Sequence, residues 1–435
     1  MEFDFTHELK RIYSSWRDIG TEPNSNFFDL FGPKGSGKTR AAQLFVRTHP
    51  HSYYISFSTP GAALGNFIKM ALTGGGEISD WESAVDDFAA ANKGLTLVFF
   101  DDAQGEEAAE CIKAFSRAMR SARNIVVCRL STTTKEYLGQ RHVRIGYRTL
   151  ADYISCLENM SRQDVLRLWA LTGGIPAIAK EIDPSLSYDE NISRLMEYDS
   201  AFTNYLPQML SEHFRFPDSY MGILSSIAHG KHRLADIAKV VGFAYNKCGT
   251  YLDALIKSGF VKKENSSYML TNSYFTAWCR YVYMKKAWLI AKPDQVLTEL
   301  RNDIDGNLAY PAFKEACFCF IDKCELRYIL PFKAFSNSQK CRQNVVVSLG
   351  HGETYTFDYV VMENDVPHFI VFPDSIDTRY TKDELPQILR AVERVKMSYY
   401  SKILIFSVNR FSDWCVHQAS LVENLHLITA DKLKY

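Results

Sequence analysis

One segment combines glycines, a lysine and a threonine at a spacing suited to holding a phosphate. Residues 32–39 read Gly-Pro-Lys-Gly-Ser-Gly-Lys-Thr, the Gly-x4-Gly-Lys-Thr pattern known as Walker A. Glycines let the backbone turn its N–H groups inward around a polyphosphate, and a helix start adds partial positive charge. The alternative is a glycine-rich turn that opens an ordinary helix. The predicted nucleotide contacts are Gly32, Pro33, Lys34, Gly35, Ser36, Gly37, Lys38, Thr39 and Arg40.

Two of these side chains have predicted chemical roles, and a pair of aspartates would complete the site. Lys38 would reach the β- and γ-phosphates as a catalytic group, and the Thr39 hydroxyl would coordinate Mg²⁺. Asp101 and Asp102 end an apolar run that begins at Leu95, as expected for a buried central strand of a parallel sheet. At that strand end Asp101 would hold Mg²⁺ through water, and Asp102 would be the base for the attacking water. The alternative is a strand that ends in an ordinary polar turn.

Two further segments could respond to the nucleotide. The strand predicted at residues 124–132 ends in polar residues, so Arg129 and Ser131 could sense the γ-phosphate. A capped strand end explains these residues equally well. Residues 172–176, Thr-Gly-Gly-Ile-Pro, end one predicted helix and start another. Glycine is a common helix C-cap and proline a common helix start, so this segment needs no functional explanation.

The surrounding sequence predicts the elements that position these residues. Apolar residues 27–31 predict a strand before the glycine loop, and residues 40–46 predict a helix after it, which is the context the motif requires. We therefore expect a parallel α/β domain over residues 1–150. Its other predicted elements are helices at 3–17, 62–72, 81–91 and 106–120, and strands at 52–58 and 143–145. A helical lid is expected over residues 151–215, with an interruption at Pro207.

Bulk properties limit the class of protein. A length of 435 residues favours several domains, because a single core rarely grows so large. The formal net charge is zero, so any surface for nucleic acid must be local. The ten cysteines include no Cys-x-x-Cys pair and suggest buried free thiols, with a metal site at Cys317, Cys319 and Cys324 as the alternative. No export signal or membrane-length apolar run is visible, so we expect a cytoplasmic protein without membrane contact.

The motifs together resemble a known family. The Gly32–Thr39 loop, Asp101–Gln104, the Ser131 strand end and Thr172–Pro176 resemble the STAND branch of the AAA+ ATPases. More narrowly, the chain is similar to prokaryotic ATPases in which this core precedes a winged helix and a nuclease-like C-terminal domain. The resemblance implies that Gly174 and Pro176 lie in the lid and contact the nucleotide.

The chain departs from that family in two places. The family's Phe-x-x-Arg-x-x-Glu-Leu segment remains only as Glu8-Leu9, with Phe5 where arginine would fall, which weakens an expected nucleotide-side contact. Asp102 replaces the usual glutamate and shortens the expected base by one methylene. Hydrolysis should therefore be slow or absent.

Residues 216–295 have the pattern of a winged helix-turn-helix. Residues 218–290 contain ten Lys/Arg and four Asp/Glu, a balance of 10 − 4 = +6 that favours contact with phosphates. Asn246, Lys247 and Thr250 would be the groove contacts if DNA binds. The alternative is a module that packs on the nucleotide domain and reports its state. Helices are predicted at 220–228, 233–242 and 245–258, and a β pair at 260–263 and 268–271.

Residues 296–435 resemble the PD-(D/E)XK nuclease fold, also called restriction-endonuclease-like. The predicted order is helix 310–320, strands 343–349, 355–362 and 368–372, helix 382–398 and strand 402–407. In that fold a helix Glu, a strand Asp and a Glu-x-Lys on the next strand bind Mg²⁺ and activate water. Glu315 and Asp358 match the first two, but residues 369–374 contain no carboxylate-x-Lys. We therefore expect a catalytically degenerate domain, and a residual nuclease is the alternative.

These patterns predict an ATP-binding, slowly hydrolysing switch that uses Mg²⁺. Only the γ-phosphate differs between its nucleotide states, so contacts to that group must control how the winged helix and C-terminal domain dock. The alternatives are an ATP-binding regulator associated with DNA and a surviving nuclease. A protein partner or self-assembly is compatible with each of these interpretations.

Overall fold

The protein was analysed as a computed structural model that describes residues 1–19, 26–58, 81–103, 105–121, 124–131, 142–323, 341–395 and 398–434. The chain forms two compact units, one of Glu2–Tyr147 and one of Met1 with Arg148–Tyr435. The helix predicted at 62–72 lies outside the described residues. Within the described ranges, no helix has the length and apolar character needed to cross a bilayer.

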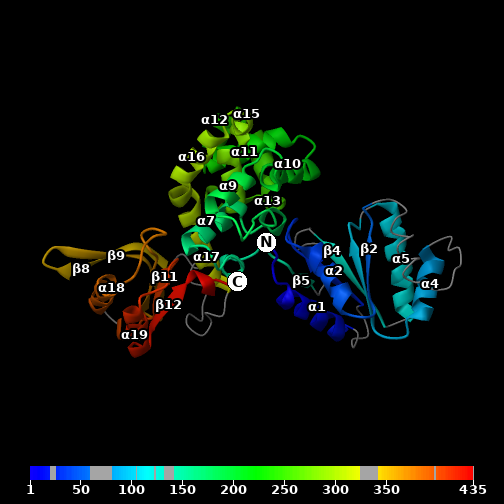
Figure 1. The fold of residues 1–435 in the computed structure, drawn as a ribbon, viewed down its shortest axis with the longest axis horizontal. Helices are drawn as coiled ribbons and strands as arrows, with labels where there is room; N and C mark the ends of the chain where they lie inside the picture. Colours follow the sequence, from blue (N-terminus) through cyan, green and yellow to red (C-terminus); the bar gives the residue numbers. More distant parts are fainter. Residues whose placement is uncertain are drawn as a thin grey trace. The chain divides into compact units, whose positions relative to one another are not determined.

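The unit Glu2–Tyr147 is a three-layer α/β domain around a parallel sheet, as predicted. Its strands run in the order β2-β3-β4-β1-β5, and every neighbouring pair is parallel. Helices α1 and α2 cover one face of the sheet, and α4 and α5 cover the other (Figure 1). The elements are α1 (Thr6–Ile19), β1 (Phe27–Phe31), α2 (Lys38–Thr48), β2 (Ser52–Ser56), α4 (Trp81–Ala91), β3 (Thr96–Asp101), α5 (Glu106–Ser121), β4 (Ile125–Ser131) and β5 (His142–Arg144).

The strand order brings the predicted site residues together at the carboxyl ends of the parallel strands. Strand β4 lies between β1, which leads into the glycine loop, and β3, which ends at Asp101. After β1 the chain crosses to β2 at one end of the sheet and returns through β3 and β4 to the side of β1. It then continues to β5 on the other side of β1, so the direction of the connections reverses at β1 and creates a topological switch point. In open α/β sheets, ligands bind outside the carboxyl ends of the strands at such a point.

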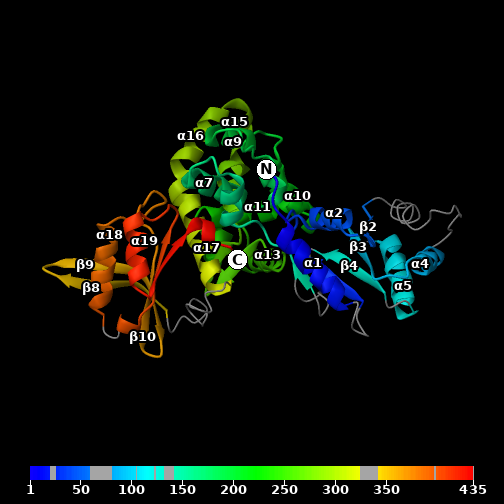
Figure 2. The same ribbon diagram turned by 60° about the horizontal axis from the view of Figure 1, so that its bottom comes forward.

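The second unit begins with helices, among them α7, α9 and α10, and continues into a winged helix-turn-helix that contains α11 and α13 (Figure 2). The wing is the antiparallel pair β6–β7. The first helices are α6 (Leu150–Cys156), α7 (Arg162–Thr172), α8 (Pro176–Ala179), α9 (Tyr188–Leu195) and α10 (Ala201–His213). The winged helix contains α11 (Pro217–Ala228), α12 (Leu234–Val241), α13 (Tyr245–Lys257), β6 (Val261–Glu264), β7 (Ser267–Leu270) and α14 (Ser273–Tyr281). After it come η2 (Tyr283–Lys285), α15 (Lys286–Ala291), α16 (Pro293–Ile304), the π-helical turn η3 (Asp305–Ala309) and α17 (Tyr310–Lys323).

The interruption expected at Pro207 does not occur, because α10 runs through that residue. Proline has no backbone N–H, so the carbonyl of Thr203, four residues earlier, loses its helical donor. The indole Nε1–H of Trp278 donates to this carbonyl over 2.8 Å. One residue earlier on α10, the Tyr274 hydroxyl accepts from the backbone N–H of Leu206 and donates to the carbonyl of Phe202. Two side chains of α14 thus satisfy backbone groups of α10, which keeps the proline inside a continuous helix.

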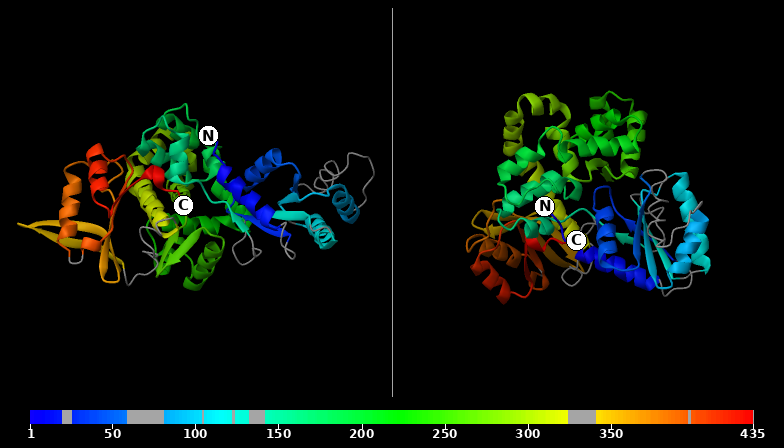
Figure 3. Two further views of the ribbon diagram at one scale, coloured as in Figure 1. Left: turned by 90° about the horizontal axis from the view of Figure 1, so that it is seen from below. Right: turned by 45° about the vertical axis from the view of Figure 1, so that its right-hand side comes forward.

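The C-terminal part of this unit is a small mixed sheet, as predicted (Figure 3). Its order is β12-β11-β10-β9-β8, with antiparallel pairing from β8 to β10 and parallel pairing from β10 to β12. The elements are β8 (Cys341–Gly350), β9 (Glu353–Glu363), β10 (Val366–Val371), α18 (Glu384–Glu393), η5 (Ser398–Tyr400), β11 (Ile403–Ser407), α19 (Asp413–Leu421), β12 (Leu425–Thr429) and η6 (Ala430–Lys432). The relationship to nucleases and the domain limits at 150, 215 and 295 stay predictions.

Candidate nucleotide site

The glycines of the loop are required by backbone conformation and by close packing. Gly35 and Gly37 have φ angles of 71° and 96°, in the left-handed region that glycine adopts without strain. Gly37 is the N-cap of α2, so the first N–H groups of that helix have no helical partners and are available to an anion. A Cβ at Gly32 would lie 2.0 Å from the Ile145 carbonyl oxygen, just after β5. The loop therefore has the tight backbone that a phosphate cradle needs.

The other loop residues also suit an anion. Ser36 is fully buried, and its hydroxyl has no hydrogen-bond partner within the described chain, so a phosphate oxygen would satisfy a group that the protein leaves unpaired. The Ser36 backbone N–H donates to the Pro33 carbonyl over 3.3 Å, which closes the turn around Lys34. Arg40 extends from α2 to an exposed ion pair with Glu2 at 3.6 Å.

Lys38 is folded across the loop. Its ammonium donates to the carbonyl oxygens of Gly32 and Pro33 over 2.8 and 2.9 Å. Burial lowers the Lys38 pKa to about 8, although the charges of Asp101 and Asp102 act in the opposite direction. A buried ammonium held by neutral carbonyls would gain from an anionic partner, which is what a polyphosphate supplies.

The predicted metal ligands Thr39 and Asp101 lie side by side, although they are 62 residues apart in sequence. The Thr39 hydroxyl donates to Asp101 Oδ2 over 2.6 Å. The same oxygen accepts the hydroxyl of Tyr54 over 2.6 Å, and Oδ1 accepts the backbone N–H of Asp102 over 3.0 Å. Burial raises the Tyr54 pKa, and the hydrogen bond to Asp101 adds to the effect. A hydroxyl and a carboxylate are the oxygen ligands that Mg²⁺ takes beside a substrate phosphate.

Asp102, the predicted base, differs from Asp101 in exposure and in backbone conformation. It is exposed and has a φ of 51°, a left-handed value that aspartate tolerates better than most residues. Asp102 directly follows β3, so it lies at the carboxyl ends of the strands, where the glycine loop also begins. Its role as base stays a prediction.

The two residues predicted to sense the γ-phosphate have different surroundings. The register pairs Arg129 of β4 with Asp29 of β1, and the guanidinium Nε donates to the fully buried Asp29 carboxylate over 2.8 Å. Arg129 therefore has a structural partner that the sequence analysis did not identify. Ser131 is buried at the end of β4, and its carbonyl accepts the backbone N–H of Gly32 over 3.2 Å. Sensing by either residue stays a prediction.

Gly174 and Pro176 belong to the second unit, and their predicted contact with nucleotide stays a prediction. The structure gives this segment a packing role. Gly174 has a φ of 69°, and a Cβ there would lie 2.2 Å from the Arg148 carbonyl oxygen. A Cβ at Gly173 would lie 1.8 Å from Asn272 Oδ1. Pro176 is in the first turn of α8, as expected for a helix start.

Phe5 also borders the loop. It occupies the position where the resembled family carries arginine, and it is 7% exposed. A Cβ at Gly37 would lie 2.8 Å from Phe5 Cζ, so the ring packs directly on the glycine turn. An aromatic ring at this position can pack against a ligand but cannot donate to a phosphate.

The two nuclease-like acidic residues, Glu315 of α17 and Asp358 of β9, each have protein partners. Glu315 accepts from Lys262 of the wing over 2.9 Å. Asp358 accepts the backbone N–H of Phe372 over 2.9 Å and lies 3.5 Å from the Lys314 ammonium. Across the described residues, no group of three His, Cys, Asp or Glu side chains could hold a metal ion. Cys317 is buried and Cys319 is half-buried, whereas Cys324 lies outside the described part of the chain.

The winged helix presents the residues proposed for DNA contact at its surface. Asn246, Lys247 and Thr250 are exposed on the first two turns of α13. The Lys247 ammonium lies 4.6 Å from the centroid of the Phe243 ring, so it is held near the start of this helix. Lys262 is bound to Glu264 and Glu315, which makes it less available to a nucleic acid.

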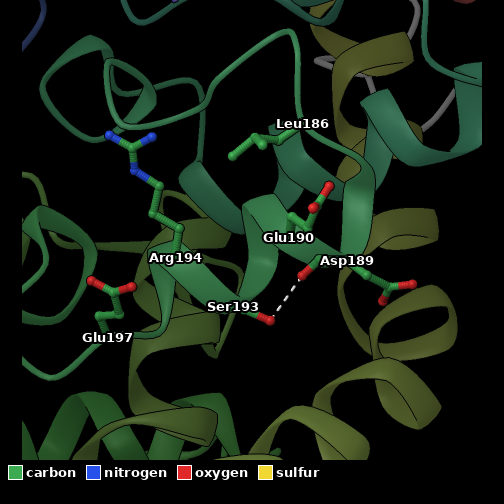
Figure 4. Close-up of a pocket in the computed structure, with 6 residues that line it drawn as sticks. All are labelled: Leu186, Asp189, Glu190, Ser193, Arg194 and Glu197. Carbon is green, nitrogen blue, oxygen red and sulfur yellow. Dashed lines mark hydrogen bonds between the residues drawn. The ribbon is translucent and has the colours of Figure 1, made fainter.

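A shallow, open pocket lies on α9 of the second unit (Figure 4). Several of its side chains already have protein partners. Glu190 accepts the Ser187 hydroxyl in the capping box of α9, and Asp189 accepts from Arg301 over 2.7 Å. None of the lining residues is a glycine, so the pocket does not resemble the nucleotide site. Its lining residues are Leu186, Asp189, Glu190, Ser193, Arg194 and Glu197.

Comparisons with known proteins agree with this architecture. Residues 218–273 match the winged helix-turn-helix family model. The chain is similar to an uncharacterized protein of Methanocaldococcus jannaschii, with 22% identity over 350 residues that cover 71% of this chain and 76% of the relative. A Walker-type ATPase of Pyrococcus abyssi has a similar structure, with a TM-score of 0.50, 16% identity and coverage of 64% of this chain and 96% of that one. At this identity the likeness shows that the chain shares the Walker-type ATPase fold.

Proposed function

We propose that the protein is a P-loop ATPase that binds ATP with Mg²⁺, hydrolyses it slowly and acts as a STAND-type switch. The observation that carries this proposal is the hydrogen bond between Thr39 and Asp101 at the edge of the glycine loop. It joins the last residue of the phosphate-binding motif to the carboxylate expected to hold the metal. The unpaired Ser36 hydroxyl and the buried Lys38 ammonium support an anionic ligand at the same place.

Different residues of the site would bind the phosphates, hold the metal ion and accept the proton. The N–H groups of the loop and of the α2 start would bind the β- and γ-phosphates, and Lys38 would orient them. Thr39 and Asp101 would hold Mg²⁺, which neutralises charge that develops on the phosphates. Asp102 would accept a proton from the attacking water, and its short side chain supports slow turnover.

The proposed switch rests on the γ-phosphate as the only chemical difference between the ATP and ADP states. Ser131 and Arg129 at the end of β4, and Gly174 and Pro176 in the second unit, are the residues proposed to respond. The winged helix and the C-terminal sheet would be the parts whose docking changes. The STAND resemblance in the motifs supports this finer assignment.

The decisive experiment is calorimetric titration of ATP into the wild-type protein and into Lys38→Ala, with and without Mg²⁺. Wild type should bind more tightly with Mg²⁺ than with EDTA. Loss of a buried charge-assisted contact should weaken binding in the variant by about 10-fold or more. Lys113→Ala is the matched control, because Lys113 is exposed on α5, outside the glycine loop, and its loss should leave ATP affinity unchanged. Equal ATP affinity in wild type and Lys38→Ala would refute the proposed site.

A second candidate function, nucleic-acid binding, is favoured by one observation. The start of α13 exposes Asn246, Lys247 and Thr250, the polar groups that a recognition helix would present to a groove. The match to a winged helix model supports the same candidate. The bonds from Lys262 to Glu264 and Glu315 argue that the wing contributes less to such contact than α13 does.

A further inference from the structure

The Tyr54 hydroxyl is a third group on the Asp101 carboxylate, and no motif pointed to it. Tyr54 lies on β2, which pairs in parallel with β3 so that Tyr54 aligns with Phe99. Its half-buried ring lies on the sheet face that Phe99 and α2 share. From there its hydroxyl reaches Asp101 Oδ2 over 2.6 Å, the same distance as the Thr39 hydroxyl.

A count of lone pairs shows what this arrangement leaves open. A carboxylate has about four acceptor positions, two on each oxygen. Among the described residues, Thr39 and Tyr54 fill both positions on Oδ2, and the backbone N–H of Asp102 fills one on Oδ1. One acceptor position therefore remains, and it is on Oδ1. A metal-bound water that donates to Asp101 would have to use it.

We propose that Tyr54 is a positioning residue for the Mg²⁺ ion of the nucleotide site, an inference that rests on the proposed function. When the Thr39 oxygen faces a metal, its proton still needs an acceptor, and Oδ2 is the acceptor already in place. Tyr54 holds that oxygen from the neighbouring strand β2, so the two hydrogen bonds on Oδ2 would restrict rotation of the carboxylate and keep the open position on Oδ1 available to the ion or its water. Hydrogen bonds to a charged acceptor are the strong ones, which suits them to fixing an orientation.

The neighbouring residue provides a matched control. Tyr53 is also half-buried on β2, but it packs on the opposite face of the sheet. Its hydroxyl donates to Asn92 Oδ1 over 3.0 Å and has no part in the Asp101 cluster. Tyr53→Phe and Tyr54→Phe therefore remove the same atom from adjacent residues, and each keeps the ring that packs in the core.

The test measures ATP affinity by calorimetry over a series of Mg²⁺ concentrations and in EDTA. For Tyr54→Phe we expect the half-saturating Mg²⁺ concentration to rise about tenfold or more, the loss expected when one hydrogen bond to a charged group is removed. ATP affinity in EDTA should stay within about twofold of wild type, because the phosphate cradle is unchanged. Tyr53→Phe should match wild type in both measurements. The paramagnetic resonance spectrum of Mn²⁺ bound with ADP gives a second readout, and only Tyr54→Phe should change it.

Two results would overturn the inference. One is an unchanged Mg²⁺ dependence and Mn²⁺ spectrum in Tyr54→Phe. The other is an equal loss of ATP affinity with Mg²⁺ and with EDTA, which would mean that Tyr54 supports the loop structurally and does not position the metal. Failure of the proposed function has a different signature, because wild type itself would then show no Mg²⁺-dependent ATP binding.

Discussion

The ion pair between Arg129 and Asp29 allows a direct test of whether Arg129 is structural or senses nucleotide. Asp29 is fully buried in the central strand β1, and Arg129 on β4 donates to it over 2.8 Å. Arg129→Met would leave a buried carboxylate without this cation. Breaking a buried pair from one side costs about 3–5 kcal/mol. The Arg129 side chain is 34% exposed, so solvent screening should reduce the cost here to about 2–3 kcal/mol.

Hydrogen exchange followed by mass spectrometry is the suitable assay, because a chain with two compact units need not unfold in one step. Peptides that cover β1 and β4 report the opening free energy of this part of the sheet. A loss of 2–3 kcal/mol should speed their exchange by about 30- to 150-fold. Peptides from the C-terminal sheet serve as an internal control and should exchange as in wild type.

The double variant Asp29→Val/Arg129→Met separates the two interpretations. Replacing both members of a buried pair with apolar side chains of similar volume is often neutral, so exchange should return to within about tenfold of wild type. If Arg129 is structural, the ratio of ATP to ADP affinity should recover in the double variant. Two results together would refute a structural role. Arg129→Met would leave hydrogen exchange at β1 unchanged but lower the ratio of ATP to ADP affinity, and this ratio would stay low in the double variant.

Two other substitutions, each paired with a control variant, test the glycine loop and the winged helix. Gly32→Ala places a Cβ 2.0 Å from the Ile145 carbonyl oxygen, so calorimetry should show at least about a tenfold loss of ATP affinity. Gly94→Ala, where a Cβ meets nothing within 4 Å, should bind as wild type does. Lys247→Gln should weaken binding of a fluorescent DNA duplex, measured by anisotropy, and lower the salt slope by about one. Lys257→Gln, which removes the same charge from the far end of α13, should have the smaller effect, and equal effects would contradict groove contact by the helix start.

The local parts of the nucleotide site could be predicted from sequence, because their signals are short-range. Residues 32–39 fix a loop at a helix start through glycine spacing alone, and α2 begins at Lys38. The continuous apolar run before Asp101 identified β3 as a buried central strand, and every residue of that strand is buried. These patterns depend on backbone conformation and burial, which neighbouring residues determine.

The contacts that complete the site depend on strand order and register, which the sequence does not show. In the sequence, Asp29 is a polar residue in an otherwise apolar strand, and nothing indicates its partner. Only the pairing of β1 with β4 shows that Arg129 lies opposite Asp29. Tyr54 looks like one of two adjacent aromatic residues, and only the alignment of β2 with β3 separates it from Tyr53. Pro207 predicted a break in the helix. The donor that replaces its missing N–H belongs to Trp278, about 70 residues later, and the Tyr274 hydroxyl bridges Leu206 and Phe202 beside it.

The glycine pair at 173–174 connects Arg148 to the start of α14 within the second unit. Arg148 follows directly after the last residue of the nucleotide-domain unit, and its backbone N–H donates to the Gly174 carbonyl over 2.7 Å. The adjacent Gly173 carbonyl accepts from Asn272, the N-cap of α14, over 2.8 Å. Neither glycine has room for a Cβ, so the turn is tightly packed. A displacement of Arg148 would therefore move the residues that contact it. Because Trp278 of α14 also donates to the Thr203 carbonyl of α10, the turn connects Arg148 to both α10 and the winged helix. We propose these contacts as the route that the switch would use inside this unit.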